Sequence, residues 1–146
     1  MADANPSAPC EVSQDDRTMA TLAHALQVVC SWIAPFVILL VKRDSLFVRF
    51  HALQALILQI CLLAVWMVGF AVFMGTMIAT MPASHSAANN PPPLAMMIAF
   101  SIFWLLAMSG WALVLILAVV YGIKAGRGEW AGYPLIGRVA RRLLKV

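Results

Sequence analysis

The first residues that could do chemistry are polar side chains along one face of the first apolar segment. They recur every three or four positions, and at 100° per residue they fall within about 120° of arc on a helix. The polar stripe consists of Thr21, His24, Gln27 and Ser31, and Arg17 extends it toward the N-terminus. Unpartnered polar groups in a membrane are costly, so these residues are functional candidates. The stripe could line a water-filled vestibule, bind a lipid headgroup, or form interhelical hydrogen bonds of about 0.6–2 kcal/mol each.

Two cofactors are conceivable alternatives. Ala20 lies four residues before His24 and leaves room for a porphyrin-type pigment, but a ligating imidazole needs a defined partner on its other nitrogen. We expect that His51 is not that partner, since a three-span arrangement places the two histidines at opposite membrane faces. Thioethers with an imidazole suit cuprous copper, yet methionine is also an adaptable packing residue. The copper candidates are Met67, Met74, Met77, Met81, His85, Met96 and Met97. Packing is the expected role, and no metal site is predicted.

No catalytic set is recognisable. Ser101 and Ser109 lack an accompanying base, and no aspartate lies inside an apolar segment. Cys10, Cys30 and Cys61 form no CxxC pair. We therefore expect a protein that is not an enzyme.

The composition indicates an integral membrane protein. Of 146 residues, 63% are hydrophobic and 11% are charged, against averages of about 45–50% and 25%, and the mean hydropathy is +0.90. No charged residue occurs between Phe50 and Ile123. These values exclude a water-soluble enzyme, a disordered linker and a nucleic-acid module, despite the net charge of +4.

The apolar segments predict an all-α protein with three transmembrane helices and a C-terminal amphipathic interfacial helix. The spans are expected at 19–41, 53–80 and 94–123, since about 20 apolar residues cross a bilayer. Asparagines and prolines within 81–93 break the helix between the last two spans. Residues 1–18 are predicted to form a mobile acidic tail, and residues 124–146 a basic one.

The basic residues predict the orientation. Arg17 precedes the first span, Lys42, Arg43 and Arg49 follow it, none lies between the second and third spans, and six follow the third. With three spans, nine of the ten basic residues lie on one side, which the positive-inside rule makes cytoplasmic. We expect a bacterial inner-membrane protein with an external N-terminus and a cytoplasmic C-terminus.

The C-terminal segment has the pattern of an amphipathic helix. Pro134 suits a first helical position, and the apolar residues that follow it recur at helical spacing. Its basic residues, which we expect to face lipid headgroups, are Arg138, Arg141, Arg142 and Lys145.

Two faces of small residues predict close helix packing. Small side chains at every fourth position let helices approach one another. They are Ala71, Gly75 and Ala79 in one segment and Ala118, Gly122 and Gly126 in the next. Because the two faces lie at opposite depths, we expect at least one to meet the first helix or another subunit.

Two segments resemble motifs of a known family. They are FVRFHALQALILQI, residues 47–60, and IKAGRGEWAGYPL, residues 123–135. The motif residues are His51, Gln54, Gln59, Lys124, Glu129, Tyr133 and Pro134. The pattern resembles small bacterial membrane proteins of unknown function related to the twenty-kilodalton (Tic) component of chloroplast protein import. The resemblance implies a helical membrane fold and a link to translocation.

The functional prediction is a non-enzymatic accessory, assembly or structural subunit. It would act by helix packing with other membrane proteins or with itself, in contact with membrane lipid and without nucleic acid. The alternative is a subunit of an oligomeric translocation pathway for protein or solute, since three helices alone enclose no pore. External copper or pigment binding is a third hypothesis.

Overall fold

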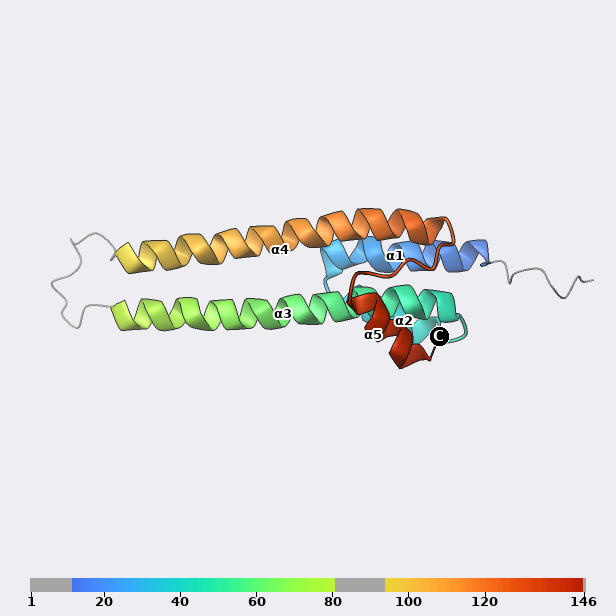
Figure 1. Cartoon of the computed structure of the whole chain (residues 1–146), viewed down its shortest axis with the longest axis horizontal. Helices are drawn as coiled ribbons and strands as arrows, with labels where there is room; N and C mark the ends of the chain where they lie inside the picture. The colour runs from blue at the N-terminus through green and yellow to red at the C-terminus, as the bar shows by residue number, and fades with distance from the viewer. Residues whose placement is uncertain (1–11, 81–93, 146) are drawn as a thin grey trace, which may run out of the picture.

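The computed structural model describes residues 12–80 and 94–145, which form five helices and no strand. The helices are α1 (Gln14–Cys30), α2 (Ile33–Val41), α3 (Leu46–Thr80), α4 (Leu94–Gly126) and α5 (Ile136–Leu144). Helices α3 and α4 form a long antiparallel pair, and the three short helices gather around one end of it (Figure 1). We call this the basic end; the opposite end, where α3 stops and α4 starts, is the far end. The all-α prediction is confirmed.

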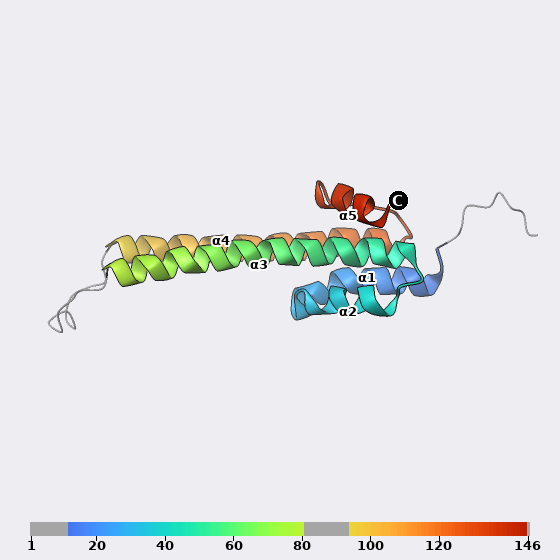
Figure 2. The same ribbon diagram turned by 90° about the horizontal axis from the view of Figure 1, so that it is seen from below.

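The prediction of a single span over 19–41 is wrong, because the chain turns back within it. Helix α1 ends at Cys30, Ser31 has a positive φ of 52°, and α2 returns toward the basic end beside α1 (Figure 2). Pro35 explains the break: in a continuous helix its ring would clash with the carbonyl of Ser31. Of the described helices, two rather than three are long and apolar enough to cross a membrane, α3 and α4.

The α1–α2 hairpin is closed at its base by charge. The Lys42 ammonium pairs with the Asp15 carboxylate and lies 4.0 Å from Oδ1 of Asp16. Ser13 caps α1, since its hydroxyl accepts a hydrogen bond from the Asp16 N–H at 3.1 Å. These contacts hold the start of α1 beside the end of α2.

The two long helices exceed the predicted spans. Helix α3 begins at Leu46, where the Ser45 hydroxyl accepts from the Val48 N–H at 3.3 Å. With 35 and 33 residues, α3 and α4 are each about 50 Å long, against a hydrocarbon core of about 30 Å. Helix α4 continues to Gly126, a non-helical link covers 127–135, and α5 follows.

The core lies at the basic end. Helix α1 packs against both α3 and α4, while α2 and α5 each pack on α3. Small buried residues such as Ala20, Ala23 and Ala52 allow this close approach. At the far end, the described residues of α3 and α4 contact each other through aromatic rings, with Phe73 stacked on Phe103 at 5.3 Å.

Candidate functional site: a buried histidine pair

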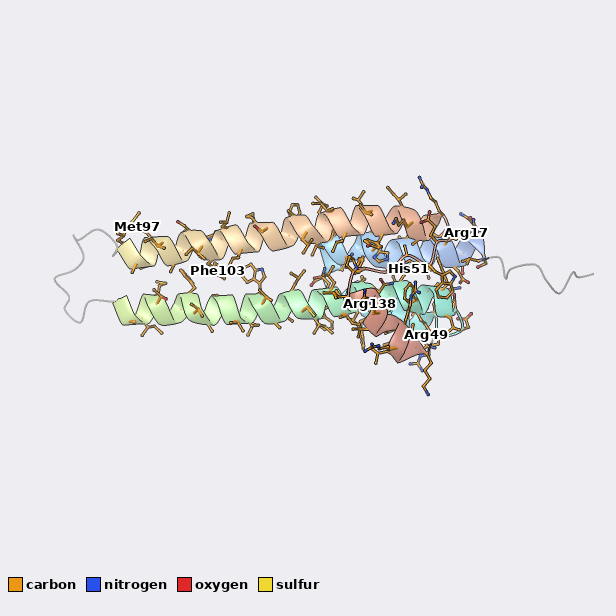
Figure 3. The ribbon with its side chains drawn as sticks, in the orientation of Figure 1. Arg17, Arg49, His51, Met97, Phe103 and Arg138 are labelled. Carbon is orange, nitrogen blue, oxygen red and sulfur yellow. The ribbon has the colours of Figure 1, made fainter. Side chains whose placement is uncertain are left out.

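Three segments of the basic end supply one polar cluster. Helix α1 supplies His24 and Gln27, α3 supplies His51 and Gln54, and the 127–135 link supplies Tyr133. Each of these five side chains is at most 2% exposed. Figure 3 shows His51 at the packed end, where the short helices overlap the long pair, and Arg17 near the outer tip of that end. The cluster is buried where the short helices and the link meet the long pair.

The hydrogen bonds of the cluster run in one direction. His51 Nε2 lies 3.1 Å from the Glu129 carbonyl oxygen, which can only accept, so this nitrogen carries a proton, and in a neutral ring His51 Nδ1 is then an acceptor. His24 Nε2 lies 3.0 Å from His51 Nδ1 and therefore donates to it. His24 Nδ1 then accepts from the Tyr133 hydroxyl at 2.8 Å. This order requires both imidazoles to be neutral.

Three glutamines complete the cluster. The Gln27 amide donates to the Tyr133 hydroxyl at 3.2 Å. Gln54 accepts from the Tyr133 backbone N–H at 2.6 Å and donates to the Phe50 carbonyl at 3.2 Å. Gln59 donates to the Gln27 carbonyl at 2.9 Å. Within the described residues, Gln27 Oε1 is the one buried side-chain polar atom without a hydrogen-bond partner. The amides thereby tie α1, α3 and the link together.

Burial also sets the protonation of the tyrosine. It raises the pKa of the Tyr133 phenol above its ordinary value, because the phenolate would lose its hydration. The Tyr121 ring packs against the Tyr133 ring with centroids 4.4 Å apart. Tyr133 therefore remains a hydroxyl donor to His24 throughout the physiological pH range.

Thr21, His24 and Gln27 of the polar stripe face the interior of the protein, whereas Ser31, at the turn after α1, is exposed. His24 and Gln27 belong to the cluster, the Thr21 hydroxyl lies within hydrogen-bonding distance of the carbonyls of Arg17 and Gly122, and the Ser31 hydroxyl lies 3.4 Å from the Gln59 oxygen. The expectation that His24 and His51 are far apart is wrong. Helix α1 enters from the same end as α3, so the two rings meet at that end.

The described residues form no evident binding site for a pigment or for copper. Both ring nitrogens of His24 are engaged inside the fold, so an axial bond to a pigment would break the cluster. Met67 and Met97 are 62% and 55% exposed, and Met81 and His85 lie outside the described residues. No group of three His, Cys, Asp or Glu side chains able to hold a metal occurs in residues 12–80 and 94–145.

The small-residue faces have different surroundings. Ala118 and Gly122 are buried, and a Cβ on Gly122 would lie 3.7 Å from the Cβ of His24. A Cβ on Gly126 would lie 3.2 Å from the Thr21 hydroxyl oxygen. By contrast, no described atom lies within 4 Å of a Cβ built on Gly75, in the face that also holds Ala71 and Ala79. The face on α4 therefore receives α1, and the face on α3 is open.

Helix α5 has three faces rather than two. Gly137 and Ala140 are buried against α3, whereas Leu135, Val139 and Leu143 are 73%, 46% and 63% exposed. The basic residues form the third face and are all exposed: Arg138, Arg141, Arg142 and Lys145. The predicted apolar face is thus split between protein and surroundings.

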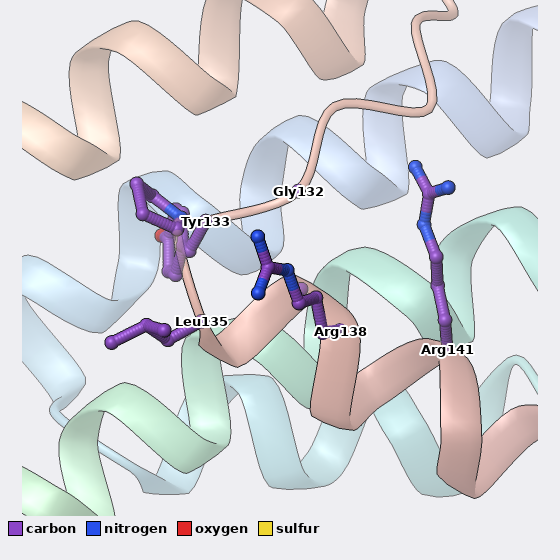
Figure 4. Close-up of a pocket in the computed structure, with 7 residues that line it drawn as sticks. Gly132, Tyr133, Leu135, Arg138 and Arg141 are labelled. Carbon is purple, nitrogen blue, oxygen red and sulfur yellow. The ribbon is translucent and has the colours of Figure 1, made fainter.

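A pocket of about 310 Å³ lies between α5 and the link. Figure 4 shows Arg138 and Arg141 extending from α5 on the side of Gly132 and Tyr133. One Arg141 nitrogen donates to the Trp130 carbonyl at 3.2 Å, and its guanidinium lies 5.5 Å from the centre of the Phe50 ring. Arg141 therefore fastens α5 to the link and to α3.

The two motif segments meet in space. From the second motif, Tyr133 and the Glu129 carbonyl join the cluster, Pro134 lines the pocket, and the Lys124 ammonium lies 5.5 Å above the Tyr121 ring. Sequence reasoning missed Tyr133 and Glu129 as partners of the histidines. The available signal was the uncharged polar residues in both motifs, which need partners in an apolar setting.

Comparison with known proteins identifies the family. Residues 15–140 match the magnetosome magnetite crystal formation protein family, MamF/MmsF. The chain belongs to this family. The match extends from the first turn of α1 into α5, so the whole cluster lies inside the part that defines a MamF/MmsF protein.

The family match corrects the earlier resemblance. The chain is a MamF/MmsF protein and not a member of a family related to chloroplast import. MamF/MmsF proteins are magnetosome membrane proteins involved in magnetite crystal formation. No curated protein and no solved structure matches the chain.

Proposed function

We propose that this chain is a non-enzymatic accessory protein of the magnetosome membrane, which supports magnetite crystal formation by packing with the transmembrane helix of a partner protein. The proposal rests on one contrast between the two ends. The polar side chains of the cluster bond to one another within the basic end, whereas the far end has an exposed apolar surface. Large exposed side chains there include Val68, Ile98 and Leu105, at 65%, 50% and 69% exposure. Such a surface needs lipid or another helix against it.

A groove at the far end suits another helix. It has a volume of about 540 Å³ and lies between α3 and α4. Its lining includes the small residues Gly69, Ala95 and Ala99 and the larger Val72 and Ile98. Transmembrane helices associate by van der Waals packing, and small residues permit the closest approach. The groove is a better candidate for partner binding than the open face around Gly75, because larger side chains flank its small residues and a helix could contact both.

The proposal includes a revised orientation. All ten basic residues lie within 17–49 and 124–145, the segments that form the basic end, and none lies in 81–93. Two spans place both described chain ends on the same side, so the positive-inside rule assigns the basic residues of this end to the cytoplasmic face of the membrane. A reporter fused before Val12 and one fused after Lys145 should both be cytoplasmic. An external N-terminal reporter would contradict the two-span arrangement.

The groove is tested by filling it. Ala99→Leu places a larger side chain in the groove, and Ala112→Leu makes the same change at an exposed site of α4 outside it. Each variant replaces the natural protein in its host, and magnetite crystals are measured by electron microscopy. We expect altered crystals with Ala99→Leu and natural crystals with Ala112→Leu. Equal membrane levels must be shown by immunoblot.

A physical readout accompanies the crystals. A photo-crosslinking residue at position 99 should yield a defined adduct in the native membrane, and one at position 112 should not. Natural crystals together with no specific adduct at position 99 would contradict the proposal. An adduct with a second copy of the chain would identify self-association rather than a different partner.

A further inference from the structure

The two ends of the molecule differ in cross-section. At the far end, the described chain consists of α3 and α4, whereas at the basic end α1, α2 and α5 lie beside the same pair (Figures 1 and 2). A helix with its side chains is about 10–12 Å across. Each added helix therefore adds about 80–110 Å² to the area of the basic end. The molecule is a wedge.

The broad end of this wedge lies within the bilayer and not beyond it. Helix α2 contains nine residues, all apolar, and exposes Ile33, Val37 and Val41 by 53%, 48% and 64%. Such a surface requires contact with acyl chains. Its length of about 13 Å matches half of the hydrocarbon core of about 30 Å, so α2 can reach through one leaflet.

The short helices are built to stay in that leaflet. His24 and Gln27 of α1 point inward to the cluster, and at the exposed turn after α1 the Ser31 hydroxyl donates to the Gln59 side-chain oxygen at 3.4 Å. The turn is therefore held to α3 by a hydrogen bond, as backbone breaks at membrane depth require. The Lys42 pairs close the hairpin at the charged surface. Leu135, just before α5, and Val139 and Leu143 on α5 are exposed beside the basic face. The broad end thus has apolar sides and a positively charged rim.

We infer that the chain acts on membrane shape, because its wedge places more protein volume in one leaflet than in the other. The ligand is the lipid surface itself. The chain favours a curved bilayer with the basic end in the convex leaflet, and at high density it bends a flat one in that direction. This inference rests on the proposed two-span arrangement.

Reconstitution into vesicles of two sizes tests the inference. The full chain is incorporated into small sonicated and large extruded vesicles of neutral phosphatidylcholine, which avoids orientation by lipid charge. Because all ten Lys and Arg residues lie at the basic end, external trypsin cleaves molecules whose basic end faces outward. The outer leaflet of a small vesicle is strongly convex. We expect the ratio of cleaved to protected chain to be severalfold higher in small vesicles than in large ones.

Two variants separate shape from charge. A chain ending at Leu135 lacks α5 but keeps Tyr133, and its orientation bias should fall. A full-length control with Arg138→Gln, Arg142→Gln and Lys145→Gln removes charge but keeps the bulk of α5 and the Arg141 contacts, and it should keep the bias. Both variants retain Arg43 and Arg127, which are exposed trypsin sites. Circular dichroism establishes that each variant is helical.

The outcomes are distinct. Equal ratios for the full chain in small and large vesicles would overturn the inference, as would a bias that disappears in the three-glutamine control. If the shortened chain does not fold, the full chain and the glutamine control still test whether the bias depends on shape or on charge. Failure of the orientation reporters would refute the two-span arrangement itself, whereas failure in vesicles alone would leave that arrangement intact and remove only the effect on membrane shape.

Discussion

The basic end and the far end of this molecule are built from the same two long helices but are stabilised in different ways. At the basic end, five helices enclose neutral imidazoles and amides that hydrogen-bond to one another. At the far end, the described helices meet through aromatic rings, and their outer surfaces are apolar. The contrast indicates where substitutions act: changes at the basic end affect folding, and changes at the far end affect contacts with the surroundings.

Removing the second imidazole should have the largest effect. His51→Leu leaves the His24 N–H and the Glu129 carbonyl without their partners in a buried place, and we expect a loss of about 3 kcal/mol in unfolding free energy. Denaturant titration in mild detergent, followed by circular dichroism, measures it. Leu105→Ala at the far end is the control and should change stability by less than about 0.5 kcal/mol. Equal losses would abolish the distinction between the two ends.

The same substitution at Gly122 on α4 and at Gly75 on α3 compares the two ends directly. Gly122→Leu inserts a side chain between α4 and α1, where His24 and Thr21 already lie within about 4 Å, and overpacking of this kind costs about 1–3 kcal/mol. Gly75→Leu is the same substitution in open space at the far end. We expect thermal unfolding to shift downward for Gly122→Leu alone. A comparable shift for Gly75→Leu would show that its face is covered within the folded chain.

Loss of the Tyr133 hydroxyl alone should lower the unfolding free energy by less than loss of the His51 imidazole. Tyr133→Phe preserves the ring packing but removes the donor to His24 and the acceptor from Gln27, at about 1–2 kcal/mol. The same denaturant titration measures the loss. Tyr121→Phe is the matched control, because no hydrogen bond of the Tyr121 hydroxyl contributes to the cluster. Equal losses for the two substitutions would contradict a role of the Tyr133 hydroxyl in the cluster.

The smallest expected effect is a dependence on alkaline pH. The pKa of Tyr133 is higher in the folded protein than in the unfolded chain, so above about pH 10 the unfolded chain releases a proton that the folded chain keeps. The contribution is therefore fully present below that pH and decreases as pH rises, by at most about 1.36 kcal/mol per pH unit. The pH dependence of the denaturation midpoint should flatten in Tyr133→Phe.

Local patterns predicted the parts of the fold that depend on local physics. Long apolar runs and the break at 81–93 yielded α3 and α4, and the basic periodicity after Pro134 yielded α5. Twenty-three uncharged residues at 19–41 were equally compatible with one span or a hairpin, and Pro35 was the one local sign of the second. The cluster was beyond such reasoning, since His24, His51 and Tyr133 are far apart in sequence and no spacing rule connects them.

The position of Tyr133 near the end of the chain has a consequence for biosynthesis. His24 and Gln27 emerge from the ribosome long before the tyrosine whose hydroxyl and backbone N–H complete their surroundings. Until then, a nascent α1 has polar groups that only water or headgroups can satisfy. We expect α1 to stay near the membrane surface during synthesis and to settle between α3 and α4 only when the last segment arrives. The cluster therefore forms only in a chain that includes Tyr133. In a chain truncated before residue 133, we expect α1 to be held loosely and to be cleaved by proteases.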